Sequence, residues 1–313
     1  MDTGSLIVII VLAAVVLLFI LPTVVLSYVL YSVLLVRTKP QKWNRSCSIP
    51  DDTEYKRMFD IGLEWEKKNH AAKSDVSILS DGYRLAGEYF DFGFRKAVII
   101  IPGRMESCLY SYFFAEPFQQ AGYNVLVIDN RSHGLSEGKR CSLGFKEYRD
   151  IIRWGTFLHD EKGIESVILH GICIGASTAL FALTSDTCPD YFRGMIAEGM
   201  YTTFAESFKN HMIEDKRPLF PLFMATMAQI RILSGANVVS DGPIKRIDRL
   251  TQPILFLHSR EDIYSLPEKA QILYDKCNAD KQLIWFDKGA HSRIRINNTA
   301  AYDDAILKFL VAI

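Results

Sequence analysis

Residues 165–185 read ESVILHGICIGASTALFALTS and decide the fold of this chain. The run before Gly171 is apolar and β-branched, as in a strand, and the run after Gly175 is rich in small helix formers. Cys173 therefore sits in a sharp strand-to-helix turn flanked by two glycines, the setting of a nucleophile elbow. The amino end of the following helix would favour a thiolate there. A buried structural cysteine in a tight turn is the alternative interpretation.

The overall composition excludes one class of partner and indicates a cellular compartment. The chain has 313 residues with 36 basic and 36 acidic side chains and no long run of one sign, so we expect no nucleic-acid partner. Its six cysteines show no CxxC spacing and no paired framework, which favours free thiols in a reducing compartment and argues against a zinc site. We expect neither a metal nor a cofactor.

The amino-terminal segment is predicted to be a membrane anchor. Residues from Leu6 to Val36 carry no charge, and about 20 apolar residues suffice to cross a bilayer. Pro22 predicts a kinked or strongly tilted span, with a re-entrant hairpin as the alternative. The leader MDTGS has no basic residue, and positive charges follow the segment instead, at Arg37, Lys39, Lys42 and Arg45. We therefore expect a single-pass, uncleaved anchor over residues 1–36, with the rest of the chain in the cytoplasm.

The remaining sequence predicts one α/β domain. Residues 37–74 form a connecting helical segment, expected to pack on the domain or on the membrane surface, in which Tyr55, Met58, Phe59, Leu63 and Trp65 recur near helical spacing. Two strands around Asp81-Gly82 indicate a hairpin, and strand-like runs then alternate with helices as in a mostly parallel sheet covered on both faces. The domain spans residues 75–313. At about 201–246 the alternation breaks into a helical insertion, interpreted as a lid over the sheet edge or as an ordinary packing helix pair.

Two later loops carry the partners that a nucleophile needs. Asp262 follows the strand-like run PILFLHS, and His291 follows QLIWFD. In doubly wound sheets such residues come from loops at the carboxyl ends of later strands, and the order nucleophile, acid, histidine agrees with this arrangement. We predict a Cys173–His291–Asp262 triad. Glu261 is the rival acid, disfavoured because it can pair with neighbouring Arg260 at the surface.

Acyl transfer also needs donors for the developing oxyanion. The backbone N–H groups of Ile174, directly after the nucleophile, and Arg104, directly after Pro102-Gly103, are the candidates. The side chain of Arg104 either holds an anionic head group or contacts solvent. His133 and His170 are interpreted as structural, the first in a turn beside the site and the second in the core.

These motifs resemble the α/β-hydrolase superfamily, and within it the monoacylglycerol lipase, lysophospholipase and serine-aminopeptidase-like branch. The resemblance covers roughly residues 75–313 through IIIPGRMES, VLVIDNRSHGLSEG, HGICIGAS, LHSREDIYSLP and DKGAHSRI. It implies an eight-stranded, mostly parallel sheet, a short helical cap and a catalytic triad at Cys173, Asp262 and His291. The chain departs from the pattern in having cysteine for serine at the elbow and Pro102-Gly103 for the usual His-Gly.

The cysteine leaves three functions open. The first is hydrolysis of an ester or thioester through a covalent acyl-enzyme. The second is acyl transfer with Cys173 as the thioester carrier, and the third is a catalytically silent protein that binds a ligand. The anchor and an apolar cap favour a small, lipid-like ester or acyl substrate and contact with the bilayer; the cap residues proposed to bind it are Phe204, Phe220, Phe223 and Met224. The oligomeric state is left open.

Overall fold

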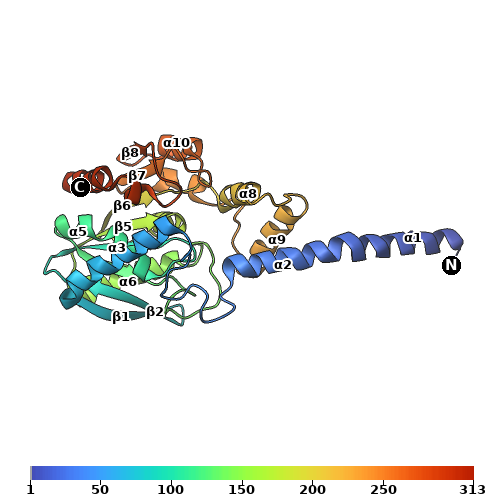
Figure 1. Cartoon of the computed structure of the whole chain (residues 1–313), viewed down its shortest axis with the longest axis horizontal. Coiled ribbons are helices and arrows are strands. Elements are labelled where there is room, and N and C mark those ends of the chain that lie inside the picture. The colour runs from blue at the N-terminus through green and yellow to red at the C-terminus, as the bar shows by residue number, and fades with distance from the viewer. Residues whose placement is uncertain (1) are drawn as a thin grey trace.

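An eight-stranded sheet forms the centre of the protein in the computed structural model, which describes residues 2–313 (Figure 1). The strands lie in the order β1-β2-β4-β3-β5-β6-β7-β8. The pairs β1/β2 and β2/β4 are antiparallel and the other pairs are parallel, which confirms the predicted sheet. The strands are β1 Lys73–Ser80, β2 Tyr83–Phe90, β3 Lys96–Ile101, β4 Asn124–Ile128, β5 Ser166–Ile172, β6 Phe192–Glu198, β7 Ile254–Ser259 and β8 Lys281–Phe286.

Local sequence explains the two kinds of strand. The central strands β4 and β7 are buried along their whole length, as expected where helices cover both faces of a parallel sheet. The edge hairpin β1/β2 turns through Asp81 and Gly82, which both have positive φ, at 47° and 79°. Such a two-residue turn matches the twist of the flanking strands, and it confirms the predicted hairpin.

Helices cover both faces of the sheet and separate two hydrophobic cores. On one face α6, α7 and α10 pack around Trp154, and on the other α3, α4, α5 and α12 pack around Phe114 and Phe118. The bounds are α3 Thr53–Asn69, α4 Cys108–Ser111, α5 Glu116–Gln120, α6 Tyr148–Lys162, α7 Ile174–Leu183, α10 Pro267–Lys276, α11 Ile294–Asn297 and α12 Thr299–Ala312, with short 3₁₀ turns at His70–Ala72, Tyr112–Phe114, Pro243–Lys245 and Ile247–Arg249.

Helix α3 belongs to the body of the domain. Its residues Tyr55, Met58 and Trp65 are buried in the same core as Val98 of β3, whereas Leu63 is exposed. The boundary expected near residue 74 therefore falls inside one continuous core. The sequence could not show this, because helical spacing alone does not tell which surface an amphipathic helix covers.

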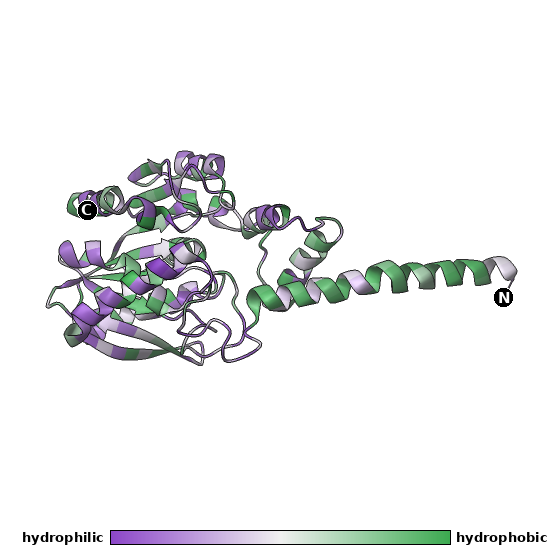
Figure 2. Cartoon of the chain, viewed as in Figure 1, coloured by the Kyte–Doolittle hydropathy of each residue, from purple (hydrophilic) through white to green (hydrophobic). Residues whose placement is uncertain are grey.

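The amino-terminal helix projects from the domain as a long apolar rod (Figures 1 and 2). It comprises α1 Thr3–Val15, a π-helical turn Val16–Ile20 and α2 Leu21–Leu35, and its length and composition suffice to cross a bilayer. Just before Pro22, where the sequence predicts a kink or a strong tilt, the helix contains the π turn, in which the N–H of Leu21 donates to the carbonyl of Val16. A π turn shifts the hydrogen-bond register where proline lacks an N–H, so the helix continues past it.

The cap is a helix pair between β6 and β7, formed by α8 Phe204–Glu214 and α9 Leu222–Ser234. Its inner side packs on the last turns of α2, where Leu30, Tyr31, Leu34 and Leu35 are buried, while α2 is largely exposed before Ser27. One apolar cluster thus joins the amino-terminal helix to the cap.

Candidate active site

Cys173 occupies a strained position between β5 and α7. Its backbone has φ 54° and ψ −111°, a combination that costs a non-glycine residue free energy and that clusters at functional sites. The backbone N–H of Cys173 donates to the carbonyl of Glu198 at the end of β6, 2.9 Å away, and α7 begins at the next residue. The surrounding structure thus holds the thiol at the carboxyl edge of the sheet, at the amino end of a helix.

The two glycines of the elbow are required by close packing. A Cβ on Gly175 would lie 2.1 Å from the carbonyl oxygen of Ile101 in β3, and a Cβ on Gly171 would lie 2.3 Å from the backbone nitrogen of Ala176. Neither glycine has a positive φ, so the conformational strain rests on Cys173 itself. The glycines therefore let α7 approach the sheet closely enough for the elbow to form.

His291 and Asp262 meet as the sequence predicts. The Nδ1 of His291 lies 2.7 Å from Oδ2 of Asp262, which is 2 % exposed. The other carboxylate oxygen, Oδ1, accepts hydrogen bonds from the backbone N–H groups of Tyr264 and Ser265, at 2.9 and 2.8 Å. Burial raises the pKa of Asp262, but the charge and hydrogen bond of His291 outweigh it and hold the pKa below its ordinary value. Asp262 is therefore an oriented carboxylate.

His291 also lies beside Cys173. Its Nε2 is buried and makes no hydrogen bond within the described residues 2–313. Burial lowers the pKa of His291, but the negative charges of Asp262 and Cys173 outweigh it and raise the pKa well above its ordinary value. The ring is thus placed to share a proton with the thiol, as in a thiolate–imidazolium pair.

The rival acid, Glu261, points elsewhere. Its carboxylate accepts the backbone N–H of Gly289 at 2.9 Å in the loop that carries His291. The expected local pair with Arg260 does not form, because Arg260 instead pairs with Asp287 at 3.2 Å. Glu261 therefore stabilises the loop that carries His291, and His291 itself is hydrogen-bonded to Asp262.

Two backbone N–H groups near the elbow are available to an oxyanion. Within residues 2–313, neither Ile174 nor Arg104 donates its backbone N–H in a hydrogen bond, whereas Gly103 gives its N–H to the carboxylate of Glu106 at 2.8 Å. The guanidinium of Arg104 is desolvated, and this lowers its pKa while the nearby Cys173 acts in the opposite direction. Arg104 thus brings a positive charge close to the thiol.

Glu106 connects this oxyanion loop to α3. It accepts the hydroxyl of Tyr55 at 2.8 Å, and Tyr55 stacks on Tyr110 with ring centroids 4.2 Å apart. Burial raises the pKa of Glu106 to about 7. Helix α3 also reaches the histidine loop, since Arg293 pairs with Asp52 at its amino end, 2.6 Å away. Sequence reasoning missed this support, because nothing local links residues so far apart in the chain.

Two further residues at the site escaped sequence reasoning. Gly199, at φ 58° after β6, leaves room for the pair of His291 and Asp262, because a Cβ on Gly199 would lie 3.2 Å from Cε1 of His291. His211 of the cap helix α8 stacks on Tyr264 with ring centroids 3.6 Å apart, and burial lowers its pKa to about 3. The position of Gly199 directly after a strand could have indicated its place at the site. No local sequence pattern indicates the same for His211.

The four residues proposed to bind substrate separate into two groups. Phe204 and Phe223 belong to the apolar cluster that includes Ile174 and touches Cys173, and both rings stack with Phe208 between them. Phe220 and Met224 instead have exposed side chains, at 84 % and 60 %. The structure therefore brings only the first pair close to the elbow.

His133 and His170 have structural surroundings. His133 stacks on Trp43 with ring centroids 4.5 Å apart, and Nε2 of His170 lies 3.1 Å from the hydroxyl of Tyr302. Both rings are buried, and neither is hydrogen-bonded to His291 or Asp262 within residues 2–313. Over residues 2–313, no cluster of three histidine, cysteine or acidic side chains is arranged to hold a metal ion.

Comparison with known proteins agrees with this architecture. A model of the α/β-hydrolase fold family matches residues 96–241. The uncharacterized protein YqkD of Bacillus subtilis is 29% identical over 217 residues, which are 69% of this chain and 71% of YqkD. These matches support an α/β-hydrolase fold for this chain.

Solved structures show the same fold. The Pyrococcus furiosus esterase Pf2001 superposes with a TM-score of 0.68 at 22% identity, covering 79% of this chain and 93% of the esterase. An α/β hydrolase from Vibrio vulnificus superposes with a TM-score of 0.60 at 17% identity, and the superposition covers 88% of this chain and 99% of the Vibrio vulnificus chain. The esterase EaEST from Exiguobacterium antarcticum gives 0.58 at 15% identity, over 76% and 99% of the two chains.

Proposed function

We propose that this protein is a membrane-anchored acyl hydrolase that cleaves a lipid-like ester or thioester through a covalent intermediate on Cys173. The observation that carries the proposal is the placement of His291 between the strained Cys173 and the buried Asp262, with 2.7 Å between Nδ1 and the carboxylate. The esterases among its structural neighbours support the choice of hydrolysis. In this proposal the amino-terminal helix spans the bilayer once and the catalytic domain is cytoplasmic.

The reaction follows from the geometry. The thiolate of Cys173 attacks the carbonyl carbon, and the new oxyanion accepts hydrogen bonds from the N–H groups of Ile174 and Arg104. As the intermediate collapses, the bond to the leaving oxygen or sulfur breaks, and the imidazolium of His291 donates its Nε2 proton to that atom. His291 then takes a proton from water, which attacks the thioester and releases the acid and the thiolate. Asp262 keeps the ring oriented throughout.

An acyl chain is the favoured substrate class because of the surroundings of the elbow. Phe204 and Phe223 belong to an apolar cluster that reaches Cys173 on one side and the buried turns of α2 on the other. A fatty chain that leaves the bilayer along α2 would stay in contact with apolar side chains on its way to the thiol. The cap acts as the lid in this proposal.

Acyl transfer is the second candidate, and the identity of the nucleophile favours it. A thioester is a higher-energy acyl-enzyme than an ester and reacts readily with amines and thiols. The desolvated guanidinium of Arg104 beside Cys173 would also suit an acceptor or leaving group that carries negative charge.

The experiment uses the full-length protein in nanodiscs with acyl-thioesters and p-nitrophenyl esters of increasing chain length. We expect release of free acid by the wild type, loss of at least about 10³-fold of that rate in Cys173→Ala and His291→Ala, and an unchanged rate in Cys188→Ala, a control thiol remote from the site. Product formed only with an amine or alcohol acceptor would assign acyl transfer. Equal rates in the wild type and Cys173→Ala would refute both functions and leave a ligand-binding role.

A further inference from the structure

A large cavity lies away from the elbow, where the amino-terminal helix enters the domain. It measures about 1040 Å³ and contains none of the residues proposed for catalysis. Four segments line it: the chain just after α2, the β1/β2 hairpin at Gly82 and Tyr83, the loop between β4 and α6, and the carboxyl end of α9. The cavity is therefore built jointly by the anchor, the hydrolase body and the cap.

Backbone pairing fixes the walls of this cavity. Val36 forms an antiparallel bridge with Arg140, the N–H of Arg37 donates to the carbonyl of Lys139 at 2.8 Å, and the N–H of Cys141 donates to Leu35 at 2.9 Å. On the cap side, Nη1 of Arg140 donates to the carbonyl of Leu233 at 3.1 Å. The juxtamembrane segment is thus held against the domain by hydrogen bonds.

The lining is strongly basic, with six cations against two carboxylates. Five of these cations make no ion pair among residues 2–313: Arg37, Lys39, Lys139, Arg140 and Lys146. Arg37 uses Nη2 to donate to the carbonyls of Pro40 and Gly134, at 2.7 and 2.9 Å, while its buried Nε has no partner. Positive charges gathered at this density repel one another, so the site favours an anion.

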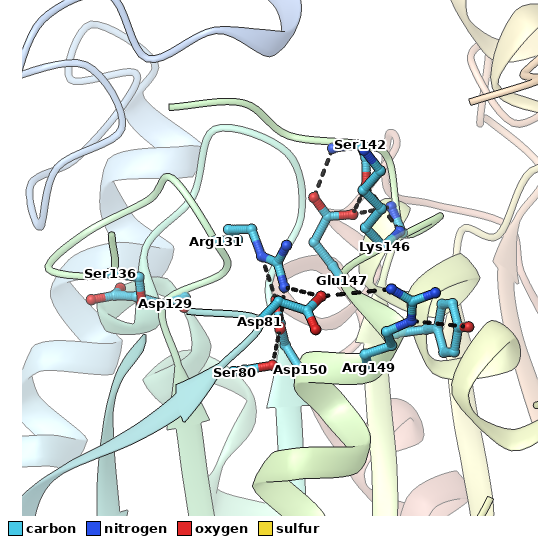
Figure 3. Close-up of polar contacts among 12 residues, drawn as sticks. Ser80, Asp81, Asp129, Arg131, Ser136, Ser142, Lys146, Glu147, Arg149 and Asp150 are labelled. Atoms are coloured by element: carbon cyan, nitrogen blue, oxygen red, sulfur yellow. Dashed lines mark hydrogen bonds and ion pairs between the residues drawn. The ribbon is translucent and has the colours of Figure 1, made fainter. Parts of the chain in front are cut away.

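The remaining charged residues of the lining are already engaged (Figure 3). Arg131 pairs with Asp150 at 2.6 Å and with Asp81 at 3.2 Å. Glu147 accepts backbone N–H groups from Ser142 and Gly144, at 2.7 and 3.0 Å, and Glu137 accepts the N–H of Arg84 at 2.8 Å. Neither carboxylate forms an ion pair with the five free cations, and the cavity lining keeps a net positive charge.

The topology of the anchor does not account for these charges. Positive residues next to a span orient it in the membrane, and this explains Arg37 and Lys39. Lys139, Arg140 and Lys146 lie about a hundred residues further along the chain, in a loop of the folded domain. Their convergence on the exit of α2 is a property of the fold.

The cavity lies close to where the bilayer surface is expected. The outer face of α2 stays apolar as far as Val33, which is 58 % exposed, and Arg37 follows shortly after the helix ends at Leu35. Helix α9 ends at the cavity and packs along α2. The exposed Met224 near the amino end of α9, and Phe220 just before that helix, therefore lie away from the cavity, toward the membrane end of the pair. The five cations are thus at the depth of lipid head groups.

We propose that this cavity is a binding site for a phosphate-bearing anion, supplied by the head group of an anionic phospholipid of the leaflet that faces the domain. Clusters of basic residues next to a span bind such head groups, and phosphate oxygens accept hydrogen bonds from lysine and arginine alike. Its volume leaves room for a polyol phosphate as well as the phosphodiester. The site is separate from the proposed catalysis, and only the lipid as source rests on the proposed anchoring.

The test measures binding to the full chain, purified in a neutral detergent, by native mass spectrometry. Three probes are titrated: phosphatidylinositol 4-phosphate, phosphatidylcholine and soluble inositol 1,4-bisphosphate. The double variant Lys139→Gln/Lys146→Gln removes two exposed charges from the cavity. The matched control, Lys67→Gln/Lys68→Gln, removes two exposed, unpaired charges from the end of α3.

We expect phosphatidylinositol 4-phosphate to bind the wild type, the control and Cys173→Ala with equal affinity. Its affinity for the cavity variant should be lower by about tenfold or more. Phosphatidylcholine, which has no net charge, should bind all of them equally weakly. If inositol bisphosphate binds as tightly as the lipid and with the same dependence on Lys139 and Lys146, a soluble phosphate is the ligand. Equal affinity of the cavity variant and the wild type for both phosphates overturns the proposal.

Discussion

Replacing Asp262 by asparagine is expected to slow the reaction of Cys173 with an electrophile, even in the absence of substrate. The carboxylate is 2 % exposed, and its Oδ2 lies 2.7 Å from Nδ1 of His291 while Oδ1 accepts two backbone N–H groups. Asparagine keeps the shape and an acceptor for the backbone. It removes the negative charge that favours the imidazolium, so the pKa of His291 falls and fewer molecules hold a thiolate–imidazolium pair.

The size of the effect follows from the lost interaction. A hydrogen bond to a charged group contributes about 1.5–3 kcal/mol, which corresponds to roughly 10- to 150-fold in the population of the ion pair at neutral pH. Alkylation of Cys173 by iodoacetamide, which requires the thiolate, should slow by about that factor.

The assay follows the Cys173 peptide by mass spectrometry after timed exposure of the full-length protein to iodoacetamide at several pH values. Glu261→Gln is the matched control, since Glu261 bonds the backbone of Gly289 and should leave the rate unchanged. Alkylation that is equally fast in Asp262→Asn and the wild type, or slowed by Glu261→Gln alone, would refute the assignment of Asp262 as the orienting acid.

Three further predictions concern stability. Gly175→Ala forces a Cβ to 2.1 Å from a carbonyl oxygen of β3, so the free energy of unfolding in chemical denaturation should fall by about 3 kcal/mol or more. The control Gly163→Ala, with no atom near the added Cβ, should lower it by about 1 kcal/mol, and equal losses would contradict the packing argument. Burial raises the pKa of Glu106 from 4.5 to about 7, so the folded state retains a proton that the unfolded chain releases. The free energy of unfolding should therefore decline between about pH 4.5 and 7, and Glu106→Gln should remove up to about 3 kcal/mol of that decline. An unchanged dependence of the unfolding free energy on pH in Glu106→Gln would contradict this prediction. Leu35 is fully buried where α2 meets the domain, so Leu35→Ala should lower the free energy of unfolding by about 2–5 kcal/mol in thermal unfolding in detergent. The control Leu26→Ala, at a side chain that is 56 % exposed, should lower it little. The reverse order would show that α2 does not pack as described.

The sequence predicted the sheet, its hairpin and the meeting of Asp262 with His291. Parallel strands bring their carboxyl ends to one edge, so the position of a residue relative to its strand is enough to place it near the site. The same rule predicted the cap as an insertion after β6. These features depend on local pattern and on topology, both of which can be read along the chain.

What the sequence could not provide are contacts between distant side chains. The hydrogen bond from Tyr55 to Glu106, the ring of His211 over Tyr264 and the packing of Leu35 against the cap cluster depend on the orientation of helices relative to the sheet. Composition likewise could not tell Phe204, which is buried near the elbow, from Phe220, which is exposed. Both are apolar residues of the same helical insertion, and only the fold decides which one faces inward.

The central claim is that Cys173 becomes acylated. Its most direct test is brief incubation of the full-length protein with a fatty acyl-thioester, acid quenching and mass analysis of the Cys173 peptide. We predict an acyl adduct on Cys173 that hydroxylamine removes, that forms more slowly in His291→Ala, and that is absent from Cys173→Ala. Turnover of the same substrate by Cys173→Ala, or an adduct on another residue alone, would contradict the account.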